Sequence, residues 1–382
     1  SKPTPREKRR ELLELLPRRG PLAFQAFCDA LENDHVKQKF ILDKLLGRAP
    51  TQGGATSTVS MQQLETGMGE VAISGASRGT NGDIALDDTD GPIAVRVEPS
   101  TERFFNEKTS NSQPLCYTMV KQPRGLAYVV SNVTFDHLSN RGGGDVDFQN
   151  ITALLTQLGF EVRELCDKTA SEIETGIQSF AMEEAHQTAD CCVVVMMSHG
   201  KPEHIYGRDG QDSSTSPSVN IPTIISMFDN VNCPALRGKP KLFFFQACRG
   251  DTADRGTAGP DVPDAGSLLP SNFFENVTGR HEADVSTDQP TATDMLICYP
   301  TQLGNVSFRN ASNGSWFIQA ITKVFMKRAK DSTILSMMTE VNRLVSEQTS
   351  SIPGSAFDRG KQASEFINRL RKDLYFFPGI TK

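Results

Sequence analysis

The chain has 382 residues, enough for two domains with a sizeable core, and its composition is ordinary for a soluble protein. Its net charge of −6 argues against a nucleic-acid partner, and no apolar run approaches the roughly 18–20 residues of a membrane span, so we expect neither nucleic acid nor membrane as a partner. Eight cysteines without regular spacing indicate reduced thiols, so we expect a cytoplasmic protein, with the nucleus as the alternative.

The first 49 residues are expected to form three short amphipathic helices. A leucine-rich stretch ends at the helix-breaking run 17–21, and a second stretch places apolar residues at helical spacing, from Phe24 and Phe27 to Leu31. The third stretch ends at Gly47, a natural stop signal. Three short helices make a marginal core by themselves. An interaction module and a plain helical hairpin without a partner both remain open.

Residues 50–115 are expected to be a flexible linker. Gly, Ser and Thr dominate up to Gly91, and no aromatic residue occurs between Pro50 and Phe104. Such a stretch buries too little apolar surface to offset the entropy of ordering the chain. The Asp90-Gly91 step is a weak candidate for cleavage, and a solvated turn is the favoured interpretation.

Strands alternate with helices after residue 116, which predicts a mainly parallel sheet covered on both faces. Apolar runs indicate strands at 124–131, 160–165, 191–197 and 242–245. Helical periodicity indicates helices near 148–158, 169–186 and 218–230. Towards the C-terminus we expect strands at 295–299 and 374–377 and helices at 315–328 and 331–347.

Two reactive side chains follow the ends of two of these strands. Cys248 comes just after the run 242–245, and His199 comes just after 191–197, 49 positions earlier. Carboxyl ends of parallel strands share one edge of a sheet, so the two side chains can converge there. A thiol needs a basic or cationic neighbour to act as a nucleophile at neutral pH. We therefore expect Cys248 as nucleophile and His199 as base, with the backbone N–H groups of Gly200 and Cys248 as an oxyanion hole.

A structural role is the alternative for each of these residues. A single histidine is more often structural than catalytic, but this one lies at a strand end opposite a thiol. Cys191, Cys192 and Cys233 fall in or beside apolar runs, where cysteine behaves as a small hydrophobic residue. A zinc site built from Cys191, Cys192 and His199 lacks normal ligand spacing. We therefore expect no metal and no cofactor.

The run Gln246-Ala247-Cys248-Arg249-Gly250, with a histidine about fifty residues upstream, resembles the caspase family. The resemblance extends from about Arg124 to Pro378. Residues 15–31 look like the second half of a caspase recruitment domain (CARD), a six-helix death fold whose first helices would then be absent. The resemblance is to CARD-bearing initiator caspases. It implies the caspase fold: a six-stranded, mainly parallel α/β sheet with helices on both faces, preceded by a truncated all-α CARD segment.

The resemblance also implies a substrate pocket. Arg141 and Arg309 match the two arginines of the pocket for an aspartate side chain, called S1, and Gln246 matches its polar wall. Ser307 and Phe308 would line S1 and the neighbouring pocket S2, and Val306 would border S2. Two guanidinium groups can hold one carboxylate bidentately. Without the resemblance, Arg141 would read as a solvated loop charge.

The implied organisation is a partial CARD at 1–49, a linker at 50–115, a large subunit at 116–264, a cleavable linker at 265–290 and a small subunit at 291–382. Residues 251–294 contain nine Asp or Glu and two Arg or Lys, as expected of an exposed loop. An enzyme that cuts after Asp would find Asp264 followed by two small residues. We expect Asp264 to be the main processing site, with Asp284 and Asp288 as secondary sites.

The expected function is therefore that of an initiator caspase zymogen, a cysteine endopeptidase cleaving after Asp in apoptosis and activated by dimerisation and self-cleavage. Expected partners are a second copy joined through the small subunit, a CARD-containing adaptor or platform, and protein substrates with Asp at P1, the residue before the cut. The alternative is a non-catalytic death-fold scaffold of caspase shape. The presence of the thiol, the imidazole and both arginines argues against it.

Overall fold

The computed structural model describes residues 84–86, 93–110, 115–213, 215–252, 254, 290–352 and 357–381. All of them belong to one compact unit, residues 80–382. The expected CARD segment therefore lies outside the described residues. So does the cleavable linker between the two expected subunits, here called the connector, up to residue 289. Within the described ranges, no helix combines the length and the apolar character needed to cross a membrane.

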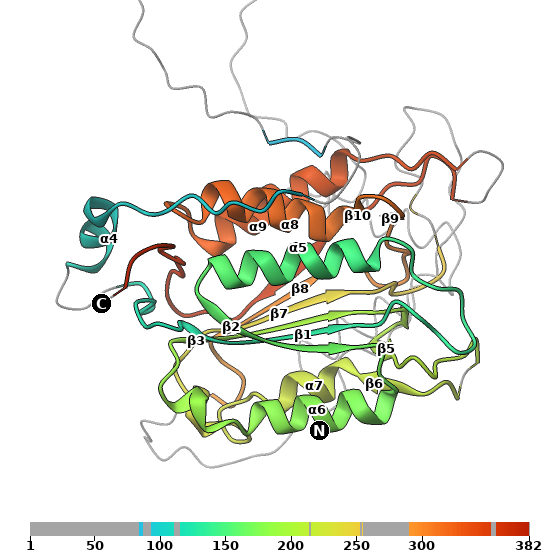
Figure 1. The fold of residues 1–382 in the computed structure, drawn as a ribbon, viewed down its shortest axis with the longest axis horizontal. Helices are drawn as coiled ribbons and strands as arrows, with labels where there is room; N and C mark the ends of the chain where they lie inside the picture. Colours follow the sequence, from blue (N-terminus) through green and yellow to red (C-terminus); the bar gives the residue numbers. More distant parts are fainter. Residues whose placement is uncertain are drawn as a thin grey trace, which may run out of the picture. The chain divides into compact units, whose positions relative to one another are not determined.

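A six-stranded sheet forms the centre of this unit, in the spatial order β11-β8-β7-β3-β1-β2 (Figure 1). The edge strand β11 runs antiparallel to β8, and the other neighbours are parallel. Every residue of β1, β3, β7 and β8 is buried, as continuous apolar strands covered on both faces should be. The expected fold class is thus confirmed. The strands are β1 (Gly125–Ser131), β2 (Phe160–Cys166), β3 (Cys191–Met197), β7 (Lys241–Gln246), β8 (Met295–Tyr299) and β11 (Glu365–Asn368).

Helices cover both faces of the sheet (Figure 1). One layer consists of α5 (Gly144–Gln157), α8 (Trp316–Arg328) and α9 (Ile334–Glu347), and the other of α6 (Ala170–Ala181) and α7 (Ile221–Ser226). Side chains of a strand alternate between the two resulting cores: Val193 and Val195 join the first, and Val194 and Met196 join the second. The double burial fixes the register of the strands, because a slip by one residue would exchange the two sets.

Two small antiparallel sheets extend the structure beyond the central strands. One contains β4 (Gly200–Lys201), β5 (His204–Tyr206) and β6 (Ser218–Asn220), and the other pairs β9 (Arg309–Asn310) with β10 (Gly314–Ser315). Short 3₁₀ turns lie at Glu184–Gln187 and Pro234–Leu236. Two residues of the expected site, Gly200 and Arg309, belong to the small sheets, and His199 directly precedes the first of them.

Two predicted elements were wrong, and the end of a third was misplaced. The helix expected at 169–186 ends at Ala181, and the one expected at 218–230 is instead β6 followed by the short helix α7, which Asn220 caps. Residues 374–377 form no strand, because Phe377 and Ile380 turn their carbonyls to the buried guanidinium of Arg124, which donates to Ile380 O at 2.7 Å. The sixth strand is β11, whose sequence is short and half polar.

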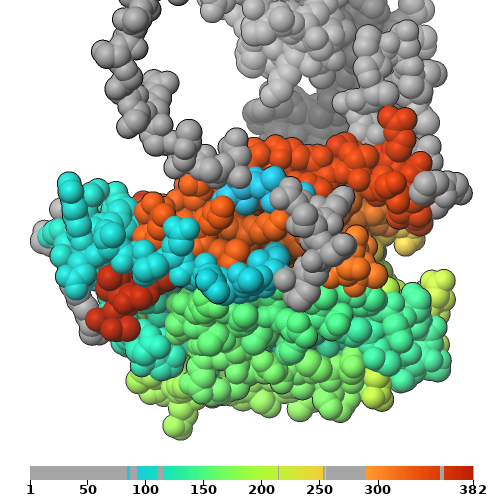
Figure 2. All heavy atoms as spheres, turned by 45° about the horizontal axis from the view of Figure 1, so that its top comes forward, coloured from blue at the N-terminus to red at the C-terminus, as the bar shows by residue number. Residues whose placement is uncertain are grey.

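The linker expected to be flexible up to residue 115 has a folded C-terminal part. Residues 93–100 run across the helical layer formed by α5, α8 and α9, and they lead into helix α4 (Glu102–Thr109) (Figure 2). Val97 N–H donates to the Gln157 side chain at 2.9 Å, and Ser100 N–H donates to Pro378 O at 2.8 Å. Phe105 is buried against Phe377. Burial of the apolar residues of this segment offsets the entropy cost of ordering it. The prediction of a flexible linker was based on the polar first part of the stretch.

Candidate active site

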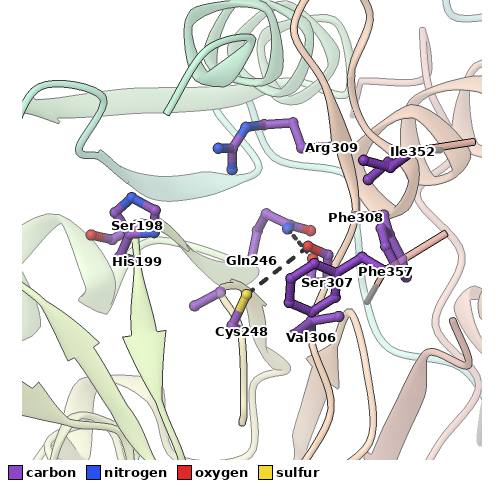
Figure 3. Close-up of a pocket in the computed structure, with 11 residues that line it drawn as sticks. Ser198, His199, Gln246, Cys248, Val306, Ser307, Phe308, Arg309, Ile352 and Phe357 are labelled. Atoms are coloured by element: carbon purple, nitrogen blue, oxygen red, sulfur yellow. Dashed lines mark hydrogen bonds between the residues drawn. The ribbon is translucent and has the colours of Figure 1, made fainter. Parts of the chain in front are cut away.

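A pocket opens at the carboxyl ends of β3 and β7 (Figure 3). It combines residues from both sides of the connector, so its walls come from both expected subunits. It contains most of the expected site residues and four that sequence reasoning missed, namely Ser198, Ala247, Ile352 and Phe357. Its lining consists of Ser198, His199, Gln246, Ala247, Cys248, Val306, Ser307, Phe308, Arg309, Ile352 and Phe357.

His199 is held in one orientation at the end of β3. Before it, Ser198 Oγ donates to Tyr206 O at 2.7 Å and anchors the strand end. The ring of His199 lies against Phe135 with 4.7 Å between centroids, and its Nε2 lies 2.9 Å from Ser139 O. A carbonyl can only accept, so Nε2 carries the hydrogen. In the neutral ring Nδ1 is then the nitrogen that can take up a proton.

The surroundings of His199 favour its neutral form. Burial lowers its pKa, and the positive charges of Arg141 and Arg309 lower it further, against the opposing effect of the Ser139 hydrogen bond. A neutral imidazole at pH 7 is the form that can accept a proton from a thiol.

Cys248 lies two residues beyond the end of β7, with its Sγ 4.0 Å from Ser307 O (Figure 3). It is partly exposed in the pocket, whereas Cys191, Cys192 and Cys298 are buried in the sheet. Burial raises the pKa of those three thiols, which keeps them protonated and unreactive. Cys166 is exposed but lies outside the pocket. Position therefore distinguishes Cys248 from these thiols.

Gly200 lies close to the backbone of Cys248. It lines a neighbouring depression together with His199 and Cys248. A Cβ atom at Gly200 would lie 2.6 Å from His204 O and 2.9 Å from the Ala247 Cβ. Only glycine fits here, so its backbone can come close to whatever occupies the pocket.

The two arginines differ in exposure and are linked by their loops. Arg141 is fully buried and does not line the pocket, and its Nη1 donates to Asn132 O at 2.9 Å. Its Nε and Nη2 have no hydrogen-bond partner among the described residues. Arg309 lines the pocket, and its Nε donates to Gly142 O at 2.7 Å. Burial lowers the pKa of Arg141 to about 10, which still leaves it positively charged at neutral pH.

Gln246 connects the nucleophile strand to the opposite wall. Its Nε2 donates to Ser307 Oγ at 2.6 Å (Figure 3). Phe308 stacks on Trp316 with 4.8 Å between ring centroids, which fixes the apolar part of this wall. Ile352 and Phe357 add an apolar rim from an irregular segment in which no sequence motif marks them.

Asp264, Asp284 and Asp288 lie outside the described residues. Where the chain is described, no group of three His, Cys, Asp or Glu side chains is arranged to hold a metal ion.

A thiol and an imidazole at adjacent strand ends of an α/β sheet are the pair that cysteine peptidases use for nucleophilic acyl transfer. The chain belongs to the caspase family: the family model described as the caspase domain matches residues 124–375. A second model, the caspase recruitment domain, matches residues 1–47, where the sequence had predicted part of such a domain.

Individual relatives agree with this assignment. Caspase-2 of Gallus gallus is 35% identical over 375 residues, which cover 97% of this chain and 85% of the relative. Caspase-9 of Homo sapiens is 30% identical over 287 residues, covering 71% of this chain and 65% of the relative. The crystal structure of Caspase-1 from Spodoptera frugiperda matches with a TM-score of 0.58 and 30% identity, covering 70% of this chain and 97% of that chain. The resemblance to CARD-bearing initiator caspases, caspase-2 among them, is thereby confirmed.

Proposed function

We propose that the chain is the zymogen of an initiator caspase that hydrolyses peptide bonds after aspartate in apoptotic signalling. The observation that carries the proposal is the pocket itself, which brings Cys248, His199 and Arg309 together from both sides of the connector. The arrangement offers a nucleophile, a proton carrier and a positive charge at three separate points of one cavity.

In the proposed reaction the Cys248 thiol gives its proton to Nδ1 of His199, and the sulfur attacks the carbonyl carbon of the P1 residue. The oxyanion that forms accepts hydrogen bonds from the N–H groups of Gly200 and Cys248, each worth roughly 3–4 kcal/mol. His199 then returns the proton to the departing amine, which leaves a thioester on Cys248. Water, deprotonated by His199, attacks the thioester and releases the acid and the free thiol.

Substrate selection is assigned to the two arginines. The P1 carboxylate would fill the pocket between Arg141 and Arg309 and satisfy the unpaired nitrogens of Arg141. Gln246 and Ser307 would form the polar wall, and Val306 and Phe308 would border the next side chain. A neutral P1 residue would leave the open Nε and Nη2 of the buried Arg141 without a partner, a loss of roughly 3–5 kcal/mol by analogy with a broken buried pair.

Peptide cleavage tests this selection. Among fluorogenic peptides that differ only at P1, the Asp peptide should be cleaved with kcat/KM about 10²–10⁴-fold above the Ala peptide, by conversion of that cost. The Glu peptide should fall well below Asp, because its longer side chain displaces the scissile carbonyl from Cys248. Equal rates for Asp and Ala would contradict the role given to the arginines.

The proposed organisation is a large subunit at 116–264, a linker at 265–290 and a small subunit at 291–382, with self-cleavage after Asp264 and trimming at Asp284 and Asp288. N-terminal sequencing of the small fragment should then read Ala265 first. Asp264→Ala should remove that fragment and leave only the products of the secondary sites. A fragment beginning elsewhere while Asp264 is intact would count against the assignment of the primary site.

We place this protein in the cytoplasm, as a homodimer joined through the small subunit. The edge strand β11 has no neighbour on its outer side among the described residues, and Ile367 is exposed on it, which supports pairing with a second copy. The CARD match supports an adaptor or platform carrying the same kind of module as the upstream partner.

A further inference from the structure

Asp147 is a buried acid just behind the pocket, and none of the steps above uses it. It lies in the first turn of α5, six residues after Arg141, and its side chain is fully buried. An ionised carboxylate is costly to bury, so a fully buried acid needs specific partners. Its Oδ1 accepts a hydrogen bond from the backbone N–H of Ser315 at 2.7 Å.

Ser315 connects this acid to the specificity arginine. In the β9–β10 pair, Ser315 lies directly opposite Arg309. Asp147 belongs to the nucleophile half of the chain, and Ser315 and Arg309 belong to the half beyond the connector. The hydrogen bond therefore holds the β9–β10 pair, which carries Arg309, against helix α5. This helix directly follows the loop that carries Arg141.

The two glycines nearest this junction show how closely the backbones approach. At Gly314, with φ +85°, a Cβ atom would lie 2.3 Å from Asp147 Oδ1. At Gly143, with φ +78°, a Cβ atom would lie 2.3 Å from Asn310 O. Both positions need glycine for conformation and for space. The β9–β10 hairpin thus lies flat against the start of α5, with the Asp147 carboxylate at the contact.

The charge of Asp147 also favours a position close to both arginines. Asp147 raises the pKa of both Arg141 and Arg309, opposing the burial that lowers them. Among the acids buried in the described ranges, it is the one whose charge acts on both arginines. Burial in turn raises the pKa of Asp147 to about 6, against the effect of Arg141. One carboxylate thus serves as counter-ion to two guanidinium groups that would otherwise repel each other.

We propose that Asp147 is a positioning residue of the pocket for the P1 carboxylate. Through Ser315 it fixes the strand that carries Arg309 against the loop that carries Arg141, so that both guanidinium groups converge on one carboxylate. The proposal rests on the proposed function, in which these arginines bind that carboxylate. The contact is non-covalent and crosses the two halves, so it persists when the connector is cut.

The test compares Asp147→Ala with Asp147→Asn, which keeps an oxygen for the Ser315 N–H. Asp147→Ala should raise KM for a P1-Asp peptide about 10- to 100-fold. The reason is that a displacement of Arg309 by about 1 Å weakens its contact with the substrate by a factor of that order. Alkylation of Cys248 by iodoacetamide, an uncharged reagent that does not need the arginines, should stay within about twofold of wild type. Asp147→Asn should raise KM less than Asp147→Ala does, because it keeps the acceptor for the Ser315 N–H and lacks only the charge. Asp145→Asn, in the same helical turn but exposed, is the matched control and should behave as wild type.

A second variant covers the case in which Asp147→Ala does not fold. Gly314→Ala displaces the carboxylate without removing it and should raise KM about tenfold. Its control is Gly379→Ala, which adds the same methyl at φ +81° on an exposed glycine and should leave KM unchanged. Unchanged KM in Gly314→Ala, or in a folded Asp147→Ala, overturns the proposal. So does an equal loss of substrate binding and of Cys248 alkylation, which indicates a collapsed site.

Failure of this inference and failure of the proposed function give different results. If the wild-type chain does not prefer Asp at P1, the proposed function itself is wrong. If the wild type prefers Asp and the Asp147 and Gly314 variants match it, only the role of Asp147 is wrong.

Discussion

Replacement of Cys248 by alanine should abolish peptide cleavage and self-processing, with a loss of at least about 10⁴-fold in kcat. The reason is that the thioester cannot form without the sulfur, so that only substrate binding and the oxyanion hole remain. The folded structure should be retained, because Cys248 is only partly buried and its Sγ makes a single long contact to Ser307 O. Kinetics with a P1-Asp peptide and gel analysis of the purified chain measure both losses.

The control for this variant is Cys166→Ala. Cys166 is an exposed thiol at the end of β2, outside the pocket, and its loss should leave both activities unchanged. Residual self-processing of pure Cys248→Ala protein would show that another group performs the chemistry. Absence of cleavage by the wild-type chain would instead favour the alternative, a non-catalytic scaffold of caspase shape.

Replacement of Arg309 by methionine should lower kcat/KM for a P1-Asp peptide about 10²–10⁴-fold. Methionine preserves much of the side-chain volume, so the loss reports the unpaired substrate carboxylate, worth roughly 3–5 kcal/mol when one partner of a buried pair is removed. Cleavage of a P1-Ala peptide should change far less, so the Asp-to-Ala preference should shrink by nearly the same factor. Lys327→Met removes an exposed positive charge from α8 and is the matched control.

The same variant predicts a change at the imidazole. Arg309 lowers the pKa of His199, so Arg309→Met should raise it. A histidine with a raised pKa stays protonated to a higher pH. The pH at which the neutral base becomes available therefore rises as well. An NMR titration of the His199 ring follows this shift directly. An unchanged or lowered pKa would contradict the electrostatic link between the arginine and the base.

The sequence predicted the buried strands well, because their composition leaves few alternatives. The strands at 191–197 and 295–299 agree with β3 and β8 to the residue. Elements at the rim were harder. The edge strand β11 was missed since half of its residues are polar, and the aromatic run 374–377 was mistaken for a strand because its packing against α4 and Arg124 is a long-range effect. The folded part of the linker was missed for the same reason.

The site divides in a similar way. Cys248 and His199 could be predicted from their places after apolar strands, and the structure brings both into one pocket. Arg141 could be singled out only by family resemblance, because nothing local in a glycine-rich loop indicates that its arginine is buried. Asp147, Ile352 and Phe357 carry no sequence signal. Their relation to the pocket depends on which loops meet after folding, which neither periodicity nor spacing encodes.

The most direct test of the central claim is to trap the acyl-accepting atom. Wild-type protein is incubated with a P1-Asp peptide carrying an electrophilic ketone, and with its P1-Ala analogue, and peptide mass spectrometry then locates the adduct. The account predicts one adduct, on Cys248, formed much faster with the Asp reagent, and no preference between the reagents in Arg309→Met. An adduct on another residue, or equal labelling of the wild type by both reagents, would contradict it.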